Sequence, residues 1–194
     1  MKKIFLTVFA ASSLLLYSTP SFALFSVSVG IPMSQTITGK QSGQSYGNAP
    51  DKTSGYFLAV QLPFALGFGI DSYTTKFKTG DCDGCWGAGG DASLKTNMTN
   101  IFYQLPVPVV NLIIGLGMGT TEYDCTYSDA TCSAAYDKGS ATQWYTSIGM
   151  PLIPLFDIHL SYRSITGKNI KYKSDGVKDD NSGSVTGLGL AFNF

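Results

Sequence analysis

Charged residues are confined to four stretches of this chain, and this confinement limits the possible folds more than any other feature. Beyond residue 23, 22 of the 24 charged residues lie in the windows 40–54, 76–95, 122–138 and 163–180, and only Asp71 and Asp157 lie elsewhere. Between the windows, bulky apolar residues alternate with small or neutral polar ones. This period of two predicts β-strands. Neither strand face carries the charges of a sheet surface that faces water.

Eight strands are predicted from this alternation. The clearest covers 111–123, where Leu112, Ile114, Leu116 and Met118 occupy one face and mostly Gly the other. The connections alternate in length, because short apolar turns hold prolines and long polar loops hold the charges. The expected strands are 24–33, 55–62, 65–74, 97–105, 111–123, 142–150, 155–163 and 183–194. The expected turns contain Pro63, Pro106/Pro108 and Pro151/Pro154, and the expected loops cover 34–54, 76–95, 123–140 and 164–182.

The first 23 residues have the features of a secretory signal peptide. Met1-Lys2-Lys3 is a basic start, Ile4 to Tyr17 is apolar, and Ser21-Phe22-Ala23 is a small-x-small cleavage site. We therefore expect an exported chain of residues 24–194, which has 11 basic and 13 acidic residues. A net charge this close to zero argues against nucleic-acid binding, which requires a basic surface.

The fold class predicted from these patterns is all-β, an eight-stranded antiparallel up-and-down transmembrane β-barrel. Short periplasmic turns and four longer extracellular loops would connect its strands. Lipid would meet the bulky face, while the small face would fill a narrow lumen. Closure of the sheet would pair every backbone amide in the lipid. Four polar residues fall on the lumen side, and we expect them to form a polar cluster there: Asp71, Asp157, His159 and Arg163.

The end of the chain resembles the C-terminal signature by which bacterial outer-membrane barrels are presented for assembly. Leu188, Leu190, Phe192 and Phe194 stand at alternate positions, and Phe194 is the last residue. The segments Phe102-Tyr103-Gln104-Leu105 and 110–117, VNLIIGLG, are similar to a poorly characterised family of small eight-stranded outer-membrane barrels. The resemblance implies the outer membrane of a Gram-negative bacterium, contact with its lipid and lipopolysaccharide, and recognition by the barrel-assembly machinery. It supplies no activity.

Four cysteines lie in two of the predicted loops. Cys82 and Cys85 form CDGC, while Cys125 and Cys132 lie in the following loop. A zinc site is one interpretation of two such pairs. We favour disulfides, because the periplasm is oxidising. Four cysteines allow three connectivities, of which Cys82–Cys85 with Cys125–Cys132 is preferred because it does not require the loops to touch.

His159 and Ser161 raise the question of catalysis. They share one strand face, and a His-x-Ser pair on a barrel strand resembles part of the catalytic set of outer-membrane lipid A deacylases. Tyr162 stands where an Asn is expected, and the single Glu beyond residue 23, Glu122, is on another strand. A polar cluster filling the lumen explains the pair better. We therefore expect no catalytic residue, cofactor or metal.

Three functions remain to be compared. The preferred one is a monomeric outer-membrane barrel with a structural or surface-interaction role, without a wide pore. The second is a lipid A-modifying acyl hydrolase using His159 and Ser161. The third is a secreted, soluble β-barrel that binds a small apolar ligand inside. The direction of Leu112, Ile114, Leu116 and Met118 separates the third from the others, because a soluble barrel would turn them inward.

Overall fold

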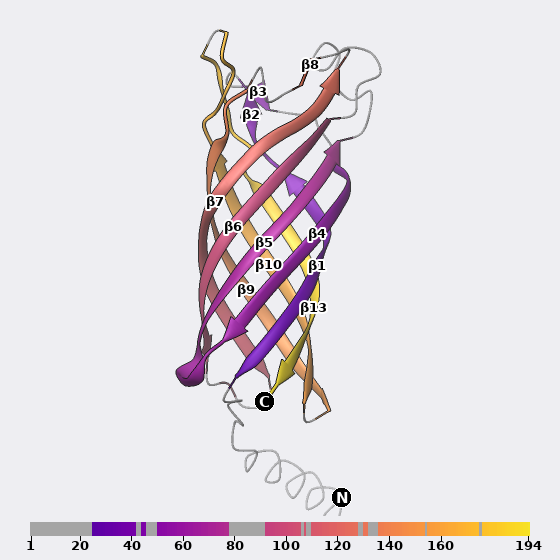
Figure 1. Cartoon of the computed structure of the whole chain (residues 1–194), viewed down its shortest axis with the longest axis vertical. Coiled ribbons are helices and arrows are strands. Elements are labelled where there is room, and N and C mark those ends of the chain that lie inside the picture. Colours follow the sequence, from indigo (N-terminus) through magenta and orange to yellow (C-terminus); the bar gives the residue numbers. More distant parts are fainter. Residues whose placement is uncertain are drawn as a thin grey trace, which may run out of the picture.

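Eight long strands form the wall of the structure (Figure 1). The computed structural model describes residues 25–41, 44–45, 50–77, 92–105, 107, 110–127, 130–131, 136–153, 155–174 and 176–194. Within them, no helix is long and apolar enough to cross a membrane. The long strands are β1 (Ser26–Ile37), β4 (Pro50–Gln61), β5 (Leu66–Phe77), β6 (Ala92–Leu105), β7 (Asn111–Tyr127), β9 (Gly139–Ile153), β10 (Phe156–Lys168) and β13 (Gly183–Asn193).

The wall is closed and entirely antiparallel. Each long strand pairs with its neighbour in sequence, β6 pairs with β7, and β1 pairs with β13, so the sheet has no free edge. Following paired residues once around the wall leads from Val27 to Thr36, nine residues further along β1 (36 − 27 = 9). This stagger tilts the strands against the barrel axis. The predicted eight-stranded antiparallel barrel is thus confirmed.

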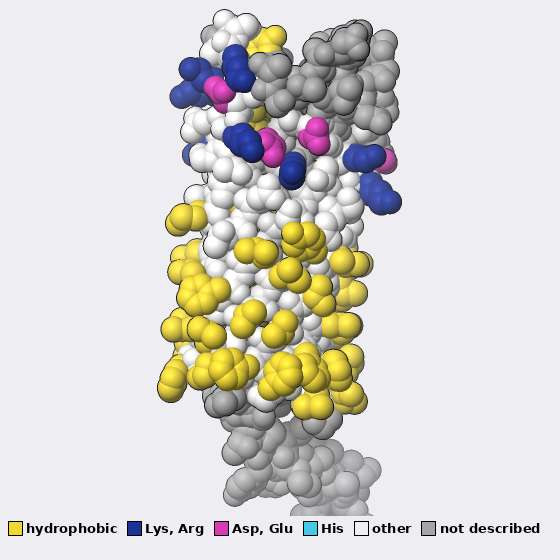
Figure 2. All heavy atoms as spheres, in the orientation of Figure 1, with side chains coloured by type: hydrophobic (Ala, Val, Ile, Leu, Met, Phe, Trp, Pro, Cys, Tyr) yellow, Lys and Arg dark blue, Asp and Glu magenta, His cyan; other side chains and the backbone are white. Residues whose placement is uncertain are grey.

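The bulky apolar face points outward. Ile114, Leu116 and Met118 are 48%, 64% and 72% exposed, and Leu112 is partly exposed. Figure 2 shows such side chains as a band across one half of the face in view. We call this surface the apolar band. Along β1 and the residue before it, the apolar band runs from Phe25 to Met33. Eight steps of about 3.3 Å along a strand tilted by about 40° make roughly 20 Å. This is close to the height of the apolar band of transmembrane β-barrels.

Glycines on the inner face leave room for large side chains of the neighbouring strand, since Gly115 is paired with Tyr145 and Gly67 with Phe102. A Cβ on Gly115 would lie 2.2 Å from the ring of Tyr145, and one on Gly67 would lie 2.0 Å from the ring of Phe102. These contacts explain why the small face is rich in glycine. The inner face thus holds aromatic residues whose rings lie over glycines of the adjacent strand.

The lumen is packed with apolar side chains at two heights. The first cluster contains Phe57, Tyr73, Met98, Ala141, Ile165 and Val185. The second lies nearer the end with the long connections, which we call the loop end. It contains Leu94, Tyr123 and Ile170, with Ile37, Phe77 and Tyr136 packed against it. The short strands β11 (Ile170–Lys171), β12 (Lys178–Asp179), β2 (Lys40–Gln41) and β3 (Gln44–Ser45) form a separate small sheet in the loop segments.

The predicted strand bounds were too short at the loop end. Strand β1 continues to Ile37, β6 begins at Ala92, and β10 continues to Lys168, so parts of the predicted loops are strand. The reason is that the outer face becomes polar beyond the apolar band, which removes the alternation while the backbone pairing continues. Pro151 is also in strand β9 rather than in a turn. Pro63 does lie in a turn, the 3-10 helix η1 (Pro63–Ala65), whereas Pro106, Pro108 and Pro154 are outside the described residues.

Candidate functional site

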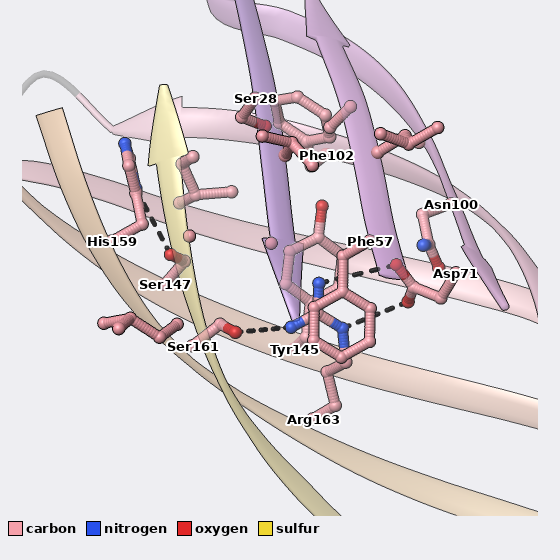
Figure 3. Close-up of a pocket in the computed structure, with 18 residues that line it drawn as sticks. Ser28, Phe57, Asp71, Asn100, Phe102, Tyr145, Ser147, His159, Ser161 and Arg163 are labelled. Carbon is pink, nitrogen blue, oxygen red and sulfur yellow. Dashed lines mark hydrogen bonds and ion pairs between the residues drawn. The ribbon is translucent and has the colours of Figure 1, made fainter. Parts of the chain in front are cut away.

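The candidate site is a small cavity inside the barrel, in the half surrounded by the apolar band. Its volume is about 60 Å³, enough for a few water molecules. Gly30, Gly69 and Gly189 line it where a larger residue would project inward. Figure 3 shows the polar side chains that face it, from strands on opposite sides of the wall. These include Ser28, Asp71, Asn100, Ser147, His159, Ser161 and Arg163.

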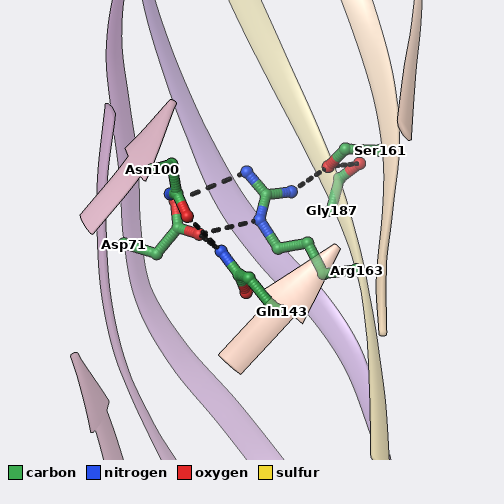
Figure 4. A network of polar contacts seen from close by, with 6 residues as sticks. All are labelled: Asp71, Asn100, Gln143, Ser161, Arg163 and Gly187. Atoms are coloured by element: carbon green, nitrogen blue, oxygen red, sulfur yellow. Dashed lines mark hydrogen bonds and ion pairs between the residues drawn. The ribbon is translucent and has the colours of Figure 1, made fainter. Parts of the chain in front are cut away.

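A buried ion pair lies at one side of this cavity. Arg163 on β10 donates from Nε to Oδ2 of Asp71 on β5, at 3.0 Å. Gln143 donates to the same Asp71 oxygen at 2.7 Å and to Oδ1 of Asn100 at 2.5 Å. Figure 4 shows this network bridging the lumen. Both charges are therefore paired and hydrogen-bonded, which burial requires.

Aromatic rings hold the Arg163 guanidinium group in place. Its Cζ lies 3.6 Å from the centroid of the Phe57 ring and 5.0 Å from that of Tyr145. These distances allow cation–π attraction to both rings. Nη1 of Arg163 also donates to Oγ of Ser161 at 2.5 Å. The side chain consequently fills the centre of the lumen, directly beside the first apolar cluster.

Asp157 and His159 belong to a second polar group. Asp157 Oδ2 accepts hydrogen bonds from Asn111 and from Asn193, the latter at 2.9 Å. Gln104 donates to Asn111 Oδ1 at 2.7 Å. The separation between His159 Nε2 and Asp157 Oδ2 is 3.9 Å, which is too long for a hydrogen bond. The four residues predicted as one lumen cluster are thus all buried, but they form two groups.

His159 and Ser161 do not form the pair that hydrolysis would need. Nδ1 of His159 lies 3.3 Å from Oγ of Ser147, whereas Ser161 donates to the carbonyl of Gly187 at 3.3 Å and accepts from Arg163. Ser147 was missed by sequence reasoning. The signal that would have found it is the register of β9 against β10, which places Ser147 opposite Ser161.

The two predicted disulfides, Cys82–Cys85 and Cys125–Cys132, lie wholly or largely outside the described residues. Cys82, Cys85 and Cys132 are not described, and only the backbone of Cys125 is, at the end of β7. The disulfide prediction therefore stays a prediction. In the described part of the chain, no three His, Cys, Asp or Glu side chains come close enough together to hold a metal ion.

The C-terminal residues lie at the end of the barrel with the short turns, opposite the loop end. Leu188, Leu190 and Phe194 are exposed on the outer face, and Phe192 is partly exposed. The Phe192 ring packs 4.8 Å from Phe156 and 4.3 Å from Phe194, measured between centroids. The backbone amide of Phe194 donates to the carbonyl of Phe25 at 2.9 Å. The end of the chain is thus integrated into the wall.

Comparison with known proteins identifies the fold but not a family. No family model and no curated protein matches the chain. Among solved structures, Neisserial surface protein A has a TM-score of 0.56 at 14% identity, over 88% of this chain and 97% of that one. Outer membrane protein W of E. coli has a TM-score of 0.55 at 13% identity, over 89% and 98%. The chain therefore has the fold of the small eight-stranded outer-membrane β-barrels.

Proposed function

We propose that this protein is an integral barrel of the outer membrane of a Gram-negative bacterium, with a structural or surface-interaction role. The apolar band carries the proposal. A soluble barrel that binds an apolar ligand would place these residues inside, whereas here the outer face is apolar and the inner face holds Arg163, Asp71 and Asp157. Such a surface is stable only in contact with lipid, because exposure of so large a continuous apolar area to water is unfavourable.

Fractionation of cells, followed by gels of boiled and unboiled samples, tests this proposal. We expect the protein in the outer-membrane fraction, with a change in gel mobility on boiling that reports a lipid-stable barrel. Ile114→Arg serves as the matched variant and should reduce the unboiled, folded form. Recovery of the wild-type chain in the soluble fraction, without a mobility change, would exclude the membrane proposal.

We further propose that the barrel conducts no large solute. The Arg163 network and the two apolar clusters fill the lumen at successive heights. An eight-stranded barrel has an interior just wide enough for side chains. Planar bilayers with the purified protein should show no porin-sized conductance. A stable large conductance that Arg163→Ala leaves unchanged would contradict this.

Hydrolysis of lipid A is not part of the proposed function. Ser161 is held by Arg163 and Gly187, and both Ser161 and His159 are buried inside the barrel, away from lipid. A nucleophile needs its base within hydrogen-bond reach and access to the substrate. Mass spectrometry of lipid A should show the same acyl chains with wild type, His159→Ala and Ser161→Ala. Loss of one chain with wild type alone would place both residues in an active site.

Assembly and oligomeric state complete the proposal. The resemblance of β13 to the C-terminal signature supports its recognition by the barrel-assembly machinery, and the closed wall needs no second copy. We expect Phe194→Ala to lower the amount of folded barrel in cells but not refolding of the purified chain. Equal losses in both assays would instead assign Phe194 a purely structural role. Cross-linking of the wild type in membranes should yield mainly monomer.

A further inference from the structure

Above the apolar band, the outer wall is neutral and rich in hydroxyl groups. Figure 2 shows this uncharged zone between the apolar side chains and the first charged ones. Cross-strand hydrogen bonds join some of its members: Ser34 with Thr186 at 2.6 Å, and Ser72 with Asn97 at 2.8 Å. We call it the neutral belt. It consists of Ser34, Thr36, Ser54, Ser72, Thr74, Asn97, Thr99, Thr120, Ser140, Thr142, Ser164, Thr166, Ser184 and Thr186.

Among the described residues, the neutral belt is found at the loop end alone. At the opposite end, the described outward residues are apolar up to the last turns, for example Leu62, Phe64 and Leu155. The strands themselves also continue past the apolar band at the loop end, as Figure 1 and Figure 2 together show. The two ends of the barrel therefore suit different surroundings. The loop end suits a thicker polar layer next to the bilayer than the opposite end does.

Three lysines project from the wall just above the neutral belt, and we call them the lysine cluster. Lys52 on β4 lies directly opposite Lys76 on β5. Lys95 on β6 is opposite Thr74, which places it diagonally from Lys76, within reach of long side chains. All three are exposed. Like charges placed opposite each other destabilise a sheet, so this arrangement favours a bound anion.

Among the described residues, no carboxylate lies within ion-pair distance of the lysine cluster. Glu122 lies opposite Lys95, but its Oε2 accepts from Nζ of Lys138 at 2.8 Å. Asp51 stands in the irregularity of pairing next to Lys52. Within the described part of the chain, no ion pair involves Lys52, Lys76 or Lys95. Within the described residues, the three lysines of the cluster therefore outnumber the two carboxylates beside them, Asp51 and Glu122.

The height of the lysine cluster identifies the kind of lipid. On β5 it lies six residues beyond Ile70, the last exposed apolar residue, and on β6 it lies six beyond Ile101, whereas on β4 Lys52 lies four beyond the exposed Tyr56. Four to six steps along a tilted strand rise roughly 10–15 Å. The polar layer of a phospholipid leaflet is only about 5–8 Å thick. Its phosphates would face the neutral belt and leave the lysines above them, whereas a headgroup of several sugars would reach both.

We propose that the neutral belt and the lysine cluster together bind the headgroup of a phosphorylated glycolipid in the outer leaflet. Sugar hydroxyls hydrogen-bond to the belt, and anionic groups further from the bilayer lie between Lys52, Lys76 and Lys95. The inference rests on the proposed membrane location and names the lipid class that the barrel prefers there.

Lipid preference of the whole reconstituted protein tests this inference. Labelled lipids are titrated into phosphatidylcholine vesicles carrying the protein, and energy transfer from its tryptophans gives relative association constants. The lipids are lipopolysaccharide, the same glycolipid without phosphates, and phosphatidylglycerol. Wild type should prefer lipopolysaccharide over phosphatidylglycerol. Because a surface lysine contributes about 1 kcal/mol toward anionic lipid, Lys52→Gln/Lys76→Gln/Lys95→Gln should weaken lipopolysaccharide binding by about 100-fold.

Two matched variants complete the test. Lys168→Gln/Lys171→Gln/Lys178→Gln removes the same charge elsewhere at the loop end and should keep the preference. Ser54→Ala/Ser72→Ala/Thr74→Val should weaken binding of the dephosphorylated glycolipid. Equal binding by wild type and the cluster variant, or equal loss in the Lys168 control, would overturn the inference. If the cluster variant keeps the mobility change on boiling, its barrel is intact. Failure of the wild type to fold in vesicles would instead count against the proposed function itself.

Discussion

The two halves of the barrel have opposite organisations. In the half within the apolar band, the outer face is apolar and the lumen holds an ion pair, His159 and Asp157. Toward the loop end, the outer face carries the neutral belt and lysines, while the lumen holds Leu94, Tyr123 and Ile170. The same wall of strands runs through both halves. What differs is the outer face, which is apolar in one half and polar in the other, while both halves of the lumen combine apolar residues with paired polar ones.

The largest expected effect comes from breaking the buried ion pair. Asp71→Asn should lower the free energy of unfolding by about 3–5 kcal/mol, because Arg163 would remain charged without a partner. Adding Arg163→Met should recover much of the loss. Glu122→Gln, which breaks the exposed pair with Lys138 at the loop end, should cost less than about 1 kcal/mol. Denaturant unfolding in lipid vesicles measures all four proteins, and equal costs for Asp71 and Glu122 would contradict the comparison.

A cation placed on the outside of each half gives the next largest difference. Ile114 and Thr120 both point outward from β7, the first in the apolar band and the second in the neutral belt. Ile114→Arg should cost about 2–4 kcal/mol, the penalty for a cation near the bilayer midplane, and Thr120→Arg about 0–1 kcal/mol. The same unfolding assay applies. A loss at Thr120 as large as that at Ile114 would show that the lipid extends over the belt.

Tyr123 tests the interior at the loop end. Its hydroxyl donates to Asn181 Oδ1 at 3.0 Å, and burial raises its pKa well above the usual value. Tyr123→Phe should cost about 1 kcal/mol at neutral pH. Because folding favours the protonated phenol, its stabilisation is complete below the unfolded pKa of about 10 and declines as pH rises above that value. Wild type should therefore lose more stability than Tyr123→Phe between pH 9 and 11, and parallel profiles would contradict this.

The smallest expected effect concerns the cysteines. The sequence predicts loops around Cys82, Cys85 and Cys132, so reduction of the predicted disulfides should leave the gel mobility change on boiling intact. Alkylation before reduction should label none of the four thiols. Complete labelling without reductant would refute the pairing, and stoichiometric zinc would replace it with a metal site.

The strands could be predicted because the lipid-facing pattern is local. Each residue from Ile114 to Met118 shows its face by alternation alone, and the confinement of charge distinguished a membrane barrel from a soluble one. The parts of β6 and β10 that extend beyond the apolar band were not predicted as strand. The reason is that a polar outer face and a polar loop have the same composition.

The lumen could be predicted only in part. Alternation placed Asp71, Asp157, His159 and Arg163 on the inner face, but it could not show which of them meet. Arg163 reaches Asp71 across 92 positions of sequence, and that contact depends on the stagger of the closed sheet. Ser147 next to His159 was missed for the same reason.

By itself, the sequence determined the number of strands, their antiparallel order and which strand face is apolar, because each depends on the period of two within short segments. Only the tertiary structure decided the partners inside the lumen, the length of the wall beyond the apolar band and the grouping of Lys52, Lys76 and Lys95. These features depend on the register between strands, which is fixed when the barrel closes and has no signature within any single strand.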